Sequence, residues 1–133
     1  MKKSILGLIA VLITSSALCQ MKESYEISVS ISGLSDSTIF LAYHFGDKQY
    51  LKDTVILDNK GYGVFSGNEL LSSGIYMIVL PGKTYFEVLI SNDQKFSISC
   101  SYSDYFNTLK FSGSEENSYF IDYQRKDSNW ISS

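Results

Sequence analysis

Residues 53–67 read DTVILDNKGYGVFSG, with four polar residues, DNKG, set between two runs of alternating apolar and polar side chains. Alternation with a period of two is typical of a strand that buries one face. Asp58 can accept a hydrogen bond from its own backbone two residues on, and Gly61 can adopt a positive φ without a Cβ clash. The stretch therefore predicts a hairpin closed by a type I turn with a left-handed glycine.

The same period recurs along most of the chain. It is clearest over residues 25–31 and 95–101, whereas residues 75–80 are nearly all apolar and predict a strand covered on both faces. The other predicted strands cover residues 38–44, 49–57, 62–66, 84–90 and 109–112. About eight short strands separated by turns predict an all-β fold, an antiparallel β-sandwich or a partly open barrel, over residues 20–113.

The pattern changes to a helical one after Gly113. Ser114 is a suitable N-cap, and Glu115 and Glu116 place carboxylates in the first turn, where they favour the helix dipole. Aromatic residues then recur at helical spacing up to Tyr123. We expect residues 114–133 to form a short C-terminal helix that frays near Ser128 and could begin a linker to a further module.

Residues 1–19 have the layout of a secretory signal peptide: two lysines, an apolar run over residues 5–13, and then small residues. The apolar run is well short of the ~20 residues that a bilayer-spanning helix needs, so no membrane span is expected. Ala17 at −3 and Cys19 at −1 permit cleavage before Gln20. We therefore expect export to the periplasm or cell envelope.

Lipid attachment is the alternative at this position, because Cys19 could be acylated once it becomes the first residue. Lipoprotein processing requires a small residue just before the cysteine, and Leu18 stands there. Plain export is the favoured interpretation.

The charge of the chain excludes some partners. Lys and Arg number 11 and Asp and Glu 14, for a formal net charge of −3, and no run of Lys or Arg occurs. Such a chain has no face that neutralises phosphates, so we expect no nucleic-acid binding. Anionic membrane surfaces are disfavoured for the same reason.

The reactive side chains do not assemble into a known catalytic motif. His44 is the single histidine, and we expect it to be a rim or packed residue of a strand. Cys100 has the inward parity of its strand and is expected to behave as a small apolar residue. After cleavage it is the one remaining thiol, so no internal disulfide forms. We predict no catalytic, cofactor or metal site and no enzyme activity.

An aromatic cluster is the strongest candidate for a contact with a ligand or a partner. Tyr102, Tyr105 and Phe106 crowd a short loop, and such a patch could bind a sugar, a peptide or another domain. The alternative, which we favour, is that the loop folds over the open end of the sandwich and satisfies its tyrosine hydroxyls at the rim.

Four stretches carry a family resemblance: KDTVILDNKGYGVFSG (52–67), GIYMIVL (74–80), YFEVLISNDQKFSI (85–98) and FSGSEENSYFIDY (111–123). Their order is similar to that of an N-terminal β-domain of unknown function. That domain precedes thioredoxin-like modules of the thiol–disulfide interchange and AhpC/TSA type in exported proteins of Gram-negative bacteria. The resemblance extends from about residue 24 to residue 123.

The resemblance implies a role and no chemistry. In that family the redox reaction belongs to the CxxC motif of the thioredoxin-like module, and these 133 residues contain no CxxC. No catalytic residue is therefore carried over. We expect an interaction or positioning module whose partner is a thioredoxin-like or other envelope protein, with a glycan- or peptide-binding module as the alternative.

Overall fold

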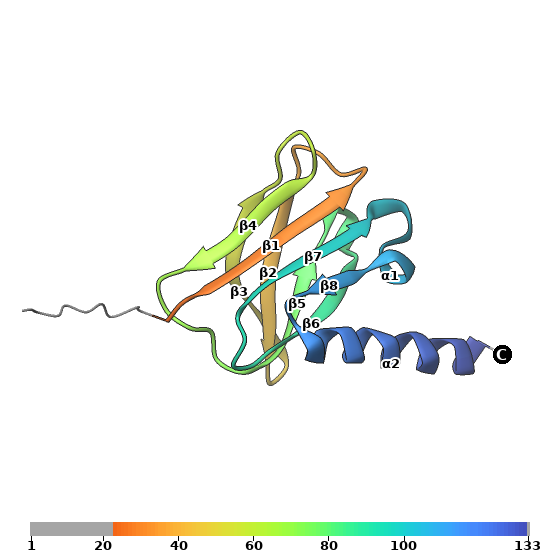
Figure 1. Ribbon diagram of the computed structural model, residues 1–133. Helices are drawn as coiled ribbons and strands as arrows, with labels where there is room; N and C mark the ends of the chain where they lie inside the picture. The colour runs from red at the N-terminus through yellow and green to blue at the C-terminus, as the bar shows by residue number, and fades with distance from the viewer. Residues whose placement is uncertain (1–22, 133) are drawn as a thin grey trace, which may run out of the picture.

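The computed structural model describes residues 23–132, with side chains described as far as residue 127, so the predicted signal peptide lies outside the described residues. Eight strands form two four-stranded sheets that face each other and do not close on themselves (Figure 1). The all-β sandwich prediction is confirmed, and the barrel alternative is not.

Each sheet combines strands from distant parts of the chain. Sheet A has the order β4-β1-β7-β8, made of β4 (Tyr62–Gly67), β1 (Tyr25–Ser32), β7 (Lys95–Ser101) and β8 (Lys110–Ser112). Sheet B has the order β3-β2-β5-β6, made of β3 (Lys48–Ile56), β2 (Thr38–Phe45), β5 (Gly74–Val79) and β6 (Tyr85–Ile90). Short helical turns η1 (Pro81–Lys83), η2 (Tyr102–Asp104) and α1 (Tyr105–Thr108) connect them, and α2 (Glu115–Ser132) ends the domain.

One strand pair departs from the antiparallel expectation. β1 and β7 run parallel, with Ile27 paired to Phe96 and Val29 to Ile98. The chain between them passes through sheet B and returns, and only a long crossover of this kind can bring two strands side by side in parallel. Local alternation carries no information about that direction.

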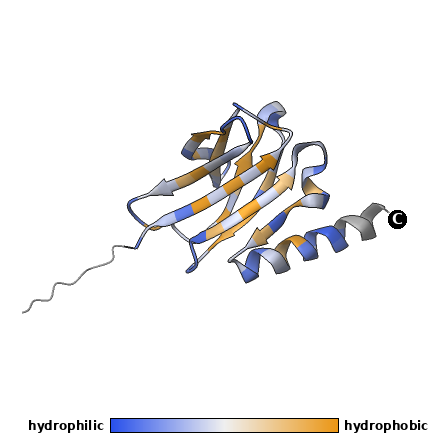
Figure 2. Ribbon diagram, turned by 45° about the horizontal axis from the view of Figure 1, so that its top comes forward, coloured by the Kyte–Doolittle hydropathy of each residue, from blue (hydrophilic) through white to orange (hydrophobic). Residues whose placement is uncertain are grey.

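The core lies between the two sheets. Inward residues of β1 and β7 meet those of β2, β5 and β6, and Figure 2 shows hydrophobic and paler residues alternating along the strands of sheet A. The fully buried side chains include Ile27, Ile39, Phe65, Ile78 and Val88. Burying aliphatic and aromatic side chains of this size stabilises a fold by about 1.5–3 kcal/mol each, so this layer supplies most of the driving force.

The DNKG turn has the predicted chemistry but joins different elements from those expected. The Asp58 Oδ1 accepts hydrogen bonds from the backbone N–H of Lys60 (2.8 Å) and of Tyr62 (3.0 Å), and Gly61 has a φ of +80°. The hairpin prediction is wrong, because β3 pairs with β2 in sheet B while β4 pairs with β1 in sheet A. The turn therefore connects the two sheets as an arch, because β4 pairs with β1, which is distant in sequence.

Helix α2 lies along one side of the sandwich, below β6 and β8 in the view of Figure 1. The buried Ser114 Oγ accepts the backbone N–H of Asn117 at 3.4 Å, as expected of an N-cap. The helix extends to Ser132, beyond the residue near which fraying is predicted, and the fraying itself stays a prediction. Neither glycine nor proline follows Ser128 to end it.

A fully buried asparagine joins this helix to the sheet. The Asn117 Oδ1 accepts the backbone N–H of Leu89 at 2.7 Å, and the Asn117 Nδ2 donates to the Leu89 carbonyl at 2.9 Å. One side-chain amide thus makes the two hydrogen bonds that a neighbouring strand would make with β6. It thereby satisfies the backbone groups of this edge of sheet B at Leu89.

Candidate functional site

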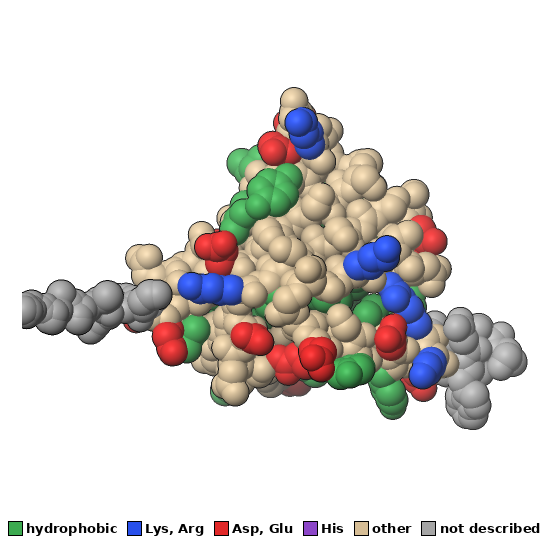
Figure 3. Space-filling model, viewed as in Figure 1, with side chains coloured by type: hydrophobic (Ala, Val, Ile, Leu, Met, Phe, Trp, Pro, Cys, Tyr) green, Lys and Arg blue, Asp and Glu red, His purple; other side chains and the backbone are tan. Residues whose placement is uncertain are grey.

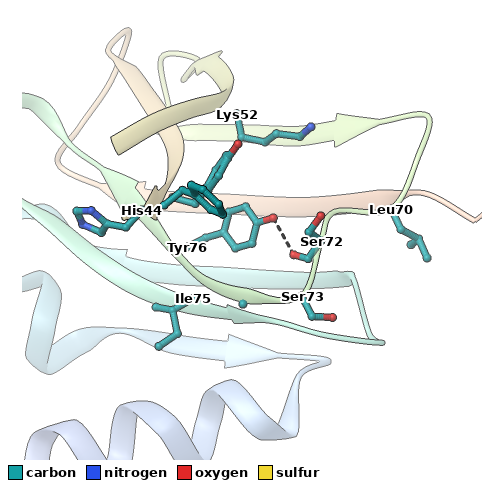
Figure 4. A pocket seen from close by; sticks show the side chains of 10 residues that line it. His44, Lys52, Leu70, Ser72, Ser73, Ile75 and Tyr76 are labelled. Atoms are coloured by element: carbon teal, nitrogen blue, oxygen red, sulfur yellow. Dashed lines mark hydrogen bonds between the residues drawn. The ribbon is translucent and has the colours of Figure 1, made fainter. Parts of the chain in front are cut away.

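One hollow lies at one end of sheet B, where the end of β2, the start of β5 and the loop over residues 68–73 come together. Its volume is about 490 Å³, within the usual range of ligand pockets. Its lining includes His44, Lys52, Leu70, Ser72, Ser73 and Tyr76 (Figure 4). These residues come from separate segments, so no spacing in the sequence could have indicated the hollow.

Tyr43 and Tyr76 line this hollow, and Tyr50 packs on Tyr43 from outside the lining. The Tyr43 ring lies 5.5 Å from the Tyr50 ring and 5.6 Å from the Tyr76 ring, measured between centroids. The Tyr76 hydroxyl donates to the Ser72 carbonyl at 2.7 Å, as Figure 4 shows. Burial, with a smaller contribution from Tyr43, raises the pKa of Tyr76, so this phenol stays protonated and serves to fix the loop.

The side chains that line the hollow are suited to binding a small polar or anionic group. Lys52, Ser72 and Ser73 offer an ammonium and two hydroxyls to a ligand. In Figure 4 the His44 imidazole points away from Tyr76, and His44 is exposed at the rim, as predicted. No hydrogen bond joins the described side chains of His44, Lys52, Ser72 and Ser73 to one another.

The predicted aromatic residues lie in η2 and α1 and are all half-buried against the core. The Tyr102 hydroxyl donates to the Pro81 carbonyl at 3.1 Å, and the Tyr105 ring lies 6.4 Å from the Phe86 ring. Arg125 of α2 anchors the segment, because its Nε donates to the Phe106 carbonyl at 3.1 Å. The segment is held at three points along its length.

Two of the three aromatic residues also line a second hollow, of about 340 Å³. Tyr85 and Gln124 also line it, whereas Tyr102 is not part of its lining. The Gln124 Nε2 donates to the Glu87 Oε1 at 2.7 Å on the same wall. The space combines aromatic surface with an amide and a carboxylate, a composition that suits a sugar or a short peptide.

The thiol of Cys100 lies in the core. Its side chain is 8% exposed, and burial raises its pKa to about 11. The thiolate, which is the reactive form, is therefore scarce at neutral pH. Within residues 23–127, no group of three or more His, Cys, Asp or Glu side chains is arranged to hold a metal ion.

Residues 25–120 match the family described as a domain of unknown function, DUF4369. The chain belongs to this family. The DUF4369 match covers all eight strands and the first turns of α2. No curated protein and no solved structure matches the chain. In the part of this DUF4369 chain that the structure describes, no helix is long and apolar enough to cross a bilayer.

Proposed function

We propose that this chain is a non-catalytic, exported DUF4369 domain that acts as an interaction or positioning module for thioredoxin-like, thiol–disulfide proteins of the cell envelope. The signal-peptide layout of residues 1–19 supports export to the periplasm or envelope. The order of strand and turn residues, similar to that of domains preceding thioredoxin-like modules, supports the choice of partner.

The environment of Cys100 is the observation that carries the non-catalytic role. Thiol–disulfide exchange proceeds by attack of an accessible thiolate, and this thiol is buried with a pKa raised to about 11. Redox chemistry in such an assembly would then belong to the cysteines of the partner, while this domain supplies a surface.

An insulin reduction assay tests the absence of activity. The purified chain with dithiothreitol is expected to precipitate insulin no faster than dithiothreitol alone, and a Cys100→Ala variant is expected to behave identically. Acceleration that disappears in Cys100→Ala would contradict the proposal. Mass spectrometry of the protein from the envelope fraction checks export, with cleavage before Gln20 as the expected result.

The partner is tested by titration of the isotope-labelled chain with purified thioredoxin-like envelope proteins of the same organism. We expect localised changes in amide chemical shifts with at least one of them. An unchanged spectrum across the set would exclude them as partners.

A glycan- or peptide-binding module is the second candidate, favoured by the hollow beside Tyr105 and Phe106. A screen of glycans and peptides that yields a ligand, with binding lost in Tyr105→Ala and retained in Tyr119→Ala, would support it. Tyr119 is an exposed residue of α2 outside that hollow, so it is a suitable control. A screen without hits would argue against this candidate.

A further inference from the structure

The outer face of sheet B, the one turned away from the core, is mainly apolar. The strand registers place Thr54, Phe40, Val79 and Tyr85 in one row across the sheet, and Leu51, Ala42, Met77 and Glu87 in the next. The exposed side chains of this face include Leu51 (61%), Ile75 (51%) and Tyr85 (49%), whereas Ala42 and Met77 at its centre are only 8% and 3% exposed. Contiguous apolar surface of this kind on a monomer is usually a contact site.

Sheet A presents a different outer face, which makes the contrast informative. Its outward positions on β1 and β7 are serines apart from Glu26 and Lys95, and the Oγ atoms of Ser28 and Ser97 lie 2.8 Å apart. The centre of this face is almost entirely tan in Figure 3, without hydrophobic side chains. The same domain thus has one hydrated face and one mainly apolar face, and Gln124 of α2 reaches the margin of the latter at Glu87.

The edges of sheet B are poorly suited to pairing with a further strand. Asn117 already occupies the hydrogen-bonding groups of Leu89 on β6. At the other edge, β3 is interrupted by a bulge opposite Leu41 and Ala42 and carries Lys48 and Lys52. Bulges and lysines are devices that prevent edge-to-edge pairing, so association has to use the face.

The charges on this face favour a second copy over a charged partner. Of its outward positions on the four strands, none is Lys or Arg, and Glu87 is the single carboxylate. That carboxylate already accepts a hydrogen bond from Gln124. A charged protein would find nothing complementary here, whereas two copies can meet without like-charge repulsion across the apolar rows.

The area is sufficient for a weak dimer. Four strands about 4.8 Å apart, each of six to nine residues at about 3.3 Å per residue, give a face on the order of 500 Å². Two copies that covered the whole face would bury at most about 1,000 Å², because Ala42 and Met77 are already buried, and specific interfaces begin near this size. Sheets also pack face to face readily, about 10 Å apart.

We propose that two copies of this chain associate through the outer faces of their B sheets, with a dissociation constant in the micromolar to millimolar range. This inference does not depend on the proposed function, because it involves no thioredoxin-like partner; Tyr85 and Glu87 at the margin of this face also line the hollow beside Tyr105.

Sedimentation equilibrium of the purified chain over that concentration range tests the proposal. We expect a reversible dimer whose dissociation constant rises at least tenfold in Leu51→Lys and in Ile75→Lys, because each buries an unpaired charge. Ser99→Lys adds the same charge to an exposed position on the face of sheet A and is expected to leave the dimer intact. Circular dichroism verifies that all three variants fold.

The unmodified chain gives a second measurement that does not depend on the variants. Methyl NMR signals of Ile75 and Met77 are expected to shift with protein concentration, while that of the core residue Ile98 stays constant. A chain that remains monomeric throughout the range, or a dimer that Ser99→Lys dissociates as well as Ile75→Lys does, would overturn the proposal.

Discussion

Replacing Gly61 by alanine tests how the DNKG arch holds the two sheets together. Gly61 has a φ of +80°, and its carbonyl accepts the backbone N–H of Ile31 at 2.8 Å. A Cβ placed on this residue would lie 2.1 Å from the Ile31 carbonyl oxygen and 2.8 Å from that of Leu34. Both neighbours are backbone atoms, so the arch itself must move to admit the methyl group.

The expected loss of stability follows from two effects. Holding alanine in the left-handed region costs about 1–2 kcal/mol. Moving the arch away from β1 breaks the hydrogen bond between Ile31 and Gly61 and leaves buried groups without partners, which adds about 1–3 kcal/mol. The sum, about 2–5 kcal/mol, is a large part of the 5–15 kcal/mol that stabilises an ordinary domain.

Gly46→Ala is a matched control, because Gly46 also has a positive φ, +66°, but its Cβ would meet nothing within 4 Å. This variant is expected to lose only the conformational part, about 1–2 kcal/mol. Urea unfolding followed by circular dichroism measures both free energies of unfolding, and equal m-values verify that the comparison is valid. If the free energies of unfolding of the two variants differ by less than about 1 kcal/mol, the steric reasoning is refuted.

Three further predictions concern hydrogen bonding and ionisation. Asn117→Ala is expected to lower the free energy of unfolding by about 2–3 kcal/mol, because the backbone N–H and carbonyl of Leu89 both lose their partner. Tyr119→Ala, on the exposed side of the same helix, should change that free energy by less than about 0.5 kcal/mol. The midpoints of urea unfolding distinguish the two variants. Backbone hydrogen bonds from Tyr62 and Lys60 hold the pKa of Asp58 below its ordinary 3.8, so its stabilising effect is present above pH 3.8 and lost as the pH falls through the lower folded value. Asp58→Asn should therefore reduce the acid-induced fall of the melting temperature, and an unchanged pH profile would contradict this assignment. Cys100 should react with Ellman's reagent slowly in the native protein and rapidly in urea, and a fast native reaction would show that the thiol is accessible.

Local patterns in the sequence predicted the elements that depend on neighbouring residues. The strand over residues 95–101 has the predicted bounds, and Asp58 accepts the hydrogen bond two residues on that its turn position required. Ser114 caps the last helix as expected. Each of these features needs only side chains within a few positions of one another, so the chain itself contains the necessary information.

The candidate site was less accessible to sequence reasoning. The aromatic residues at 102, 105 and 106 were recognisable as a cluster, but Gln124 and Glu87, which share the hollow with two of them, come from other elements. Asn117 reads as an ordinary helix residue, and its pairing with Leu89 depends on where α2 lies. No local spacing encodes such contacts.

By itself, the sequence determined that this chain alternates apolar and polar residues, turns at Asp58 to Gly61 and makes a β-sandwich. Only the tertiary structure decided that the turn is an arch, that β1 and β7 run parallel and that sheet B keeps an apolar outer face. The physical reason is that alternation requires only some buried face, which any partner strand can supply. The choice of partner, and of what covers the other face, depends on the packing of segments far apart in the chain.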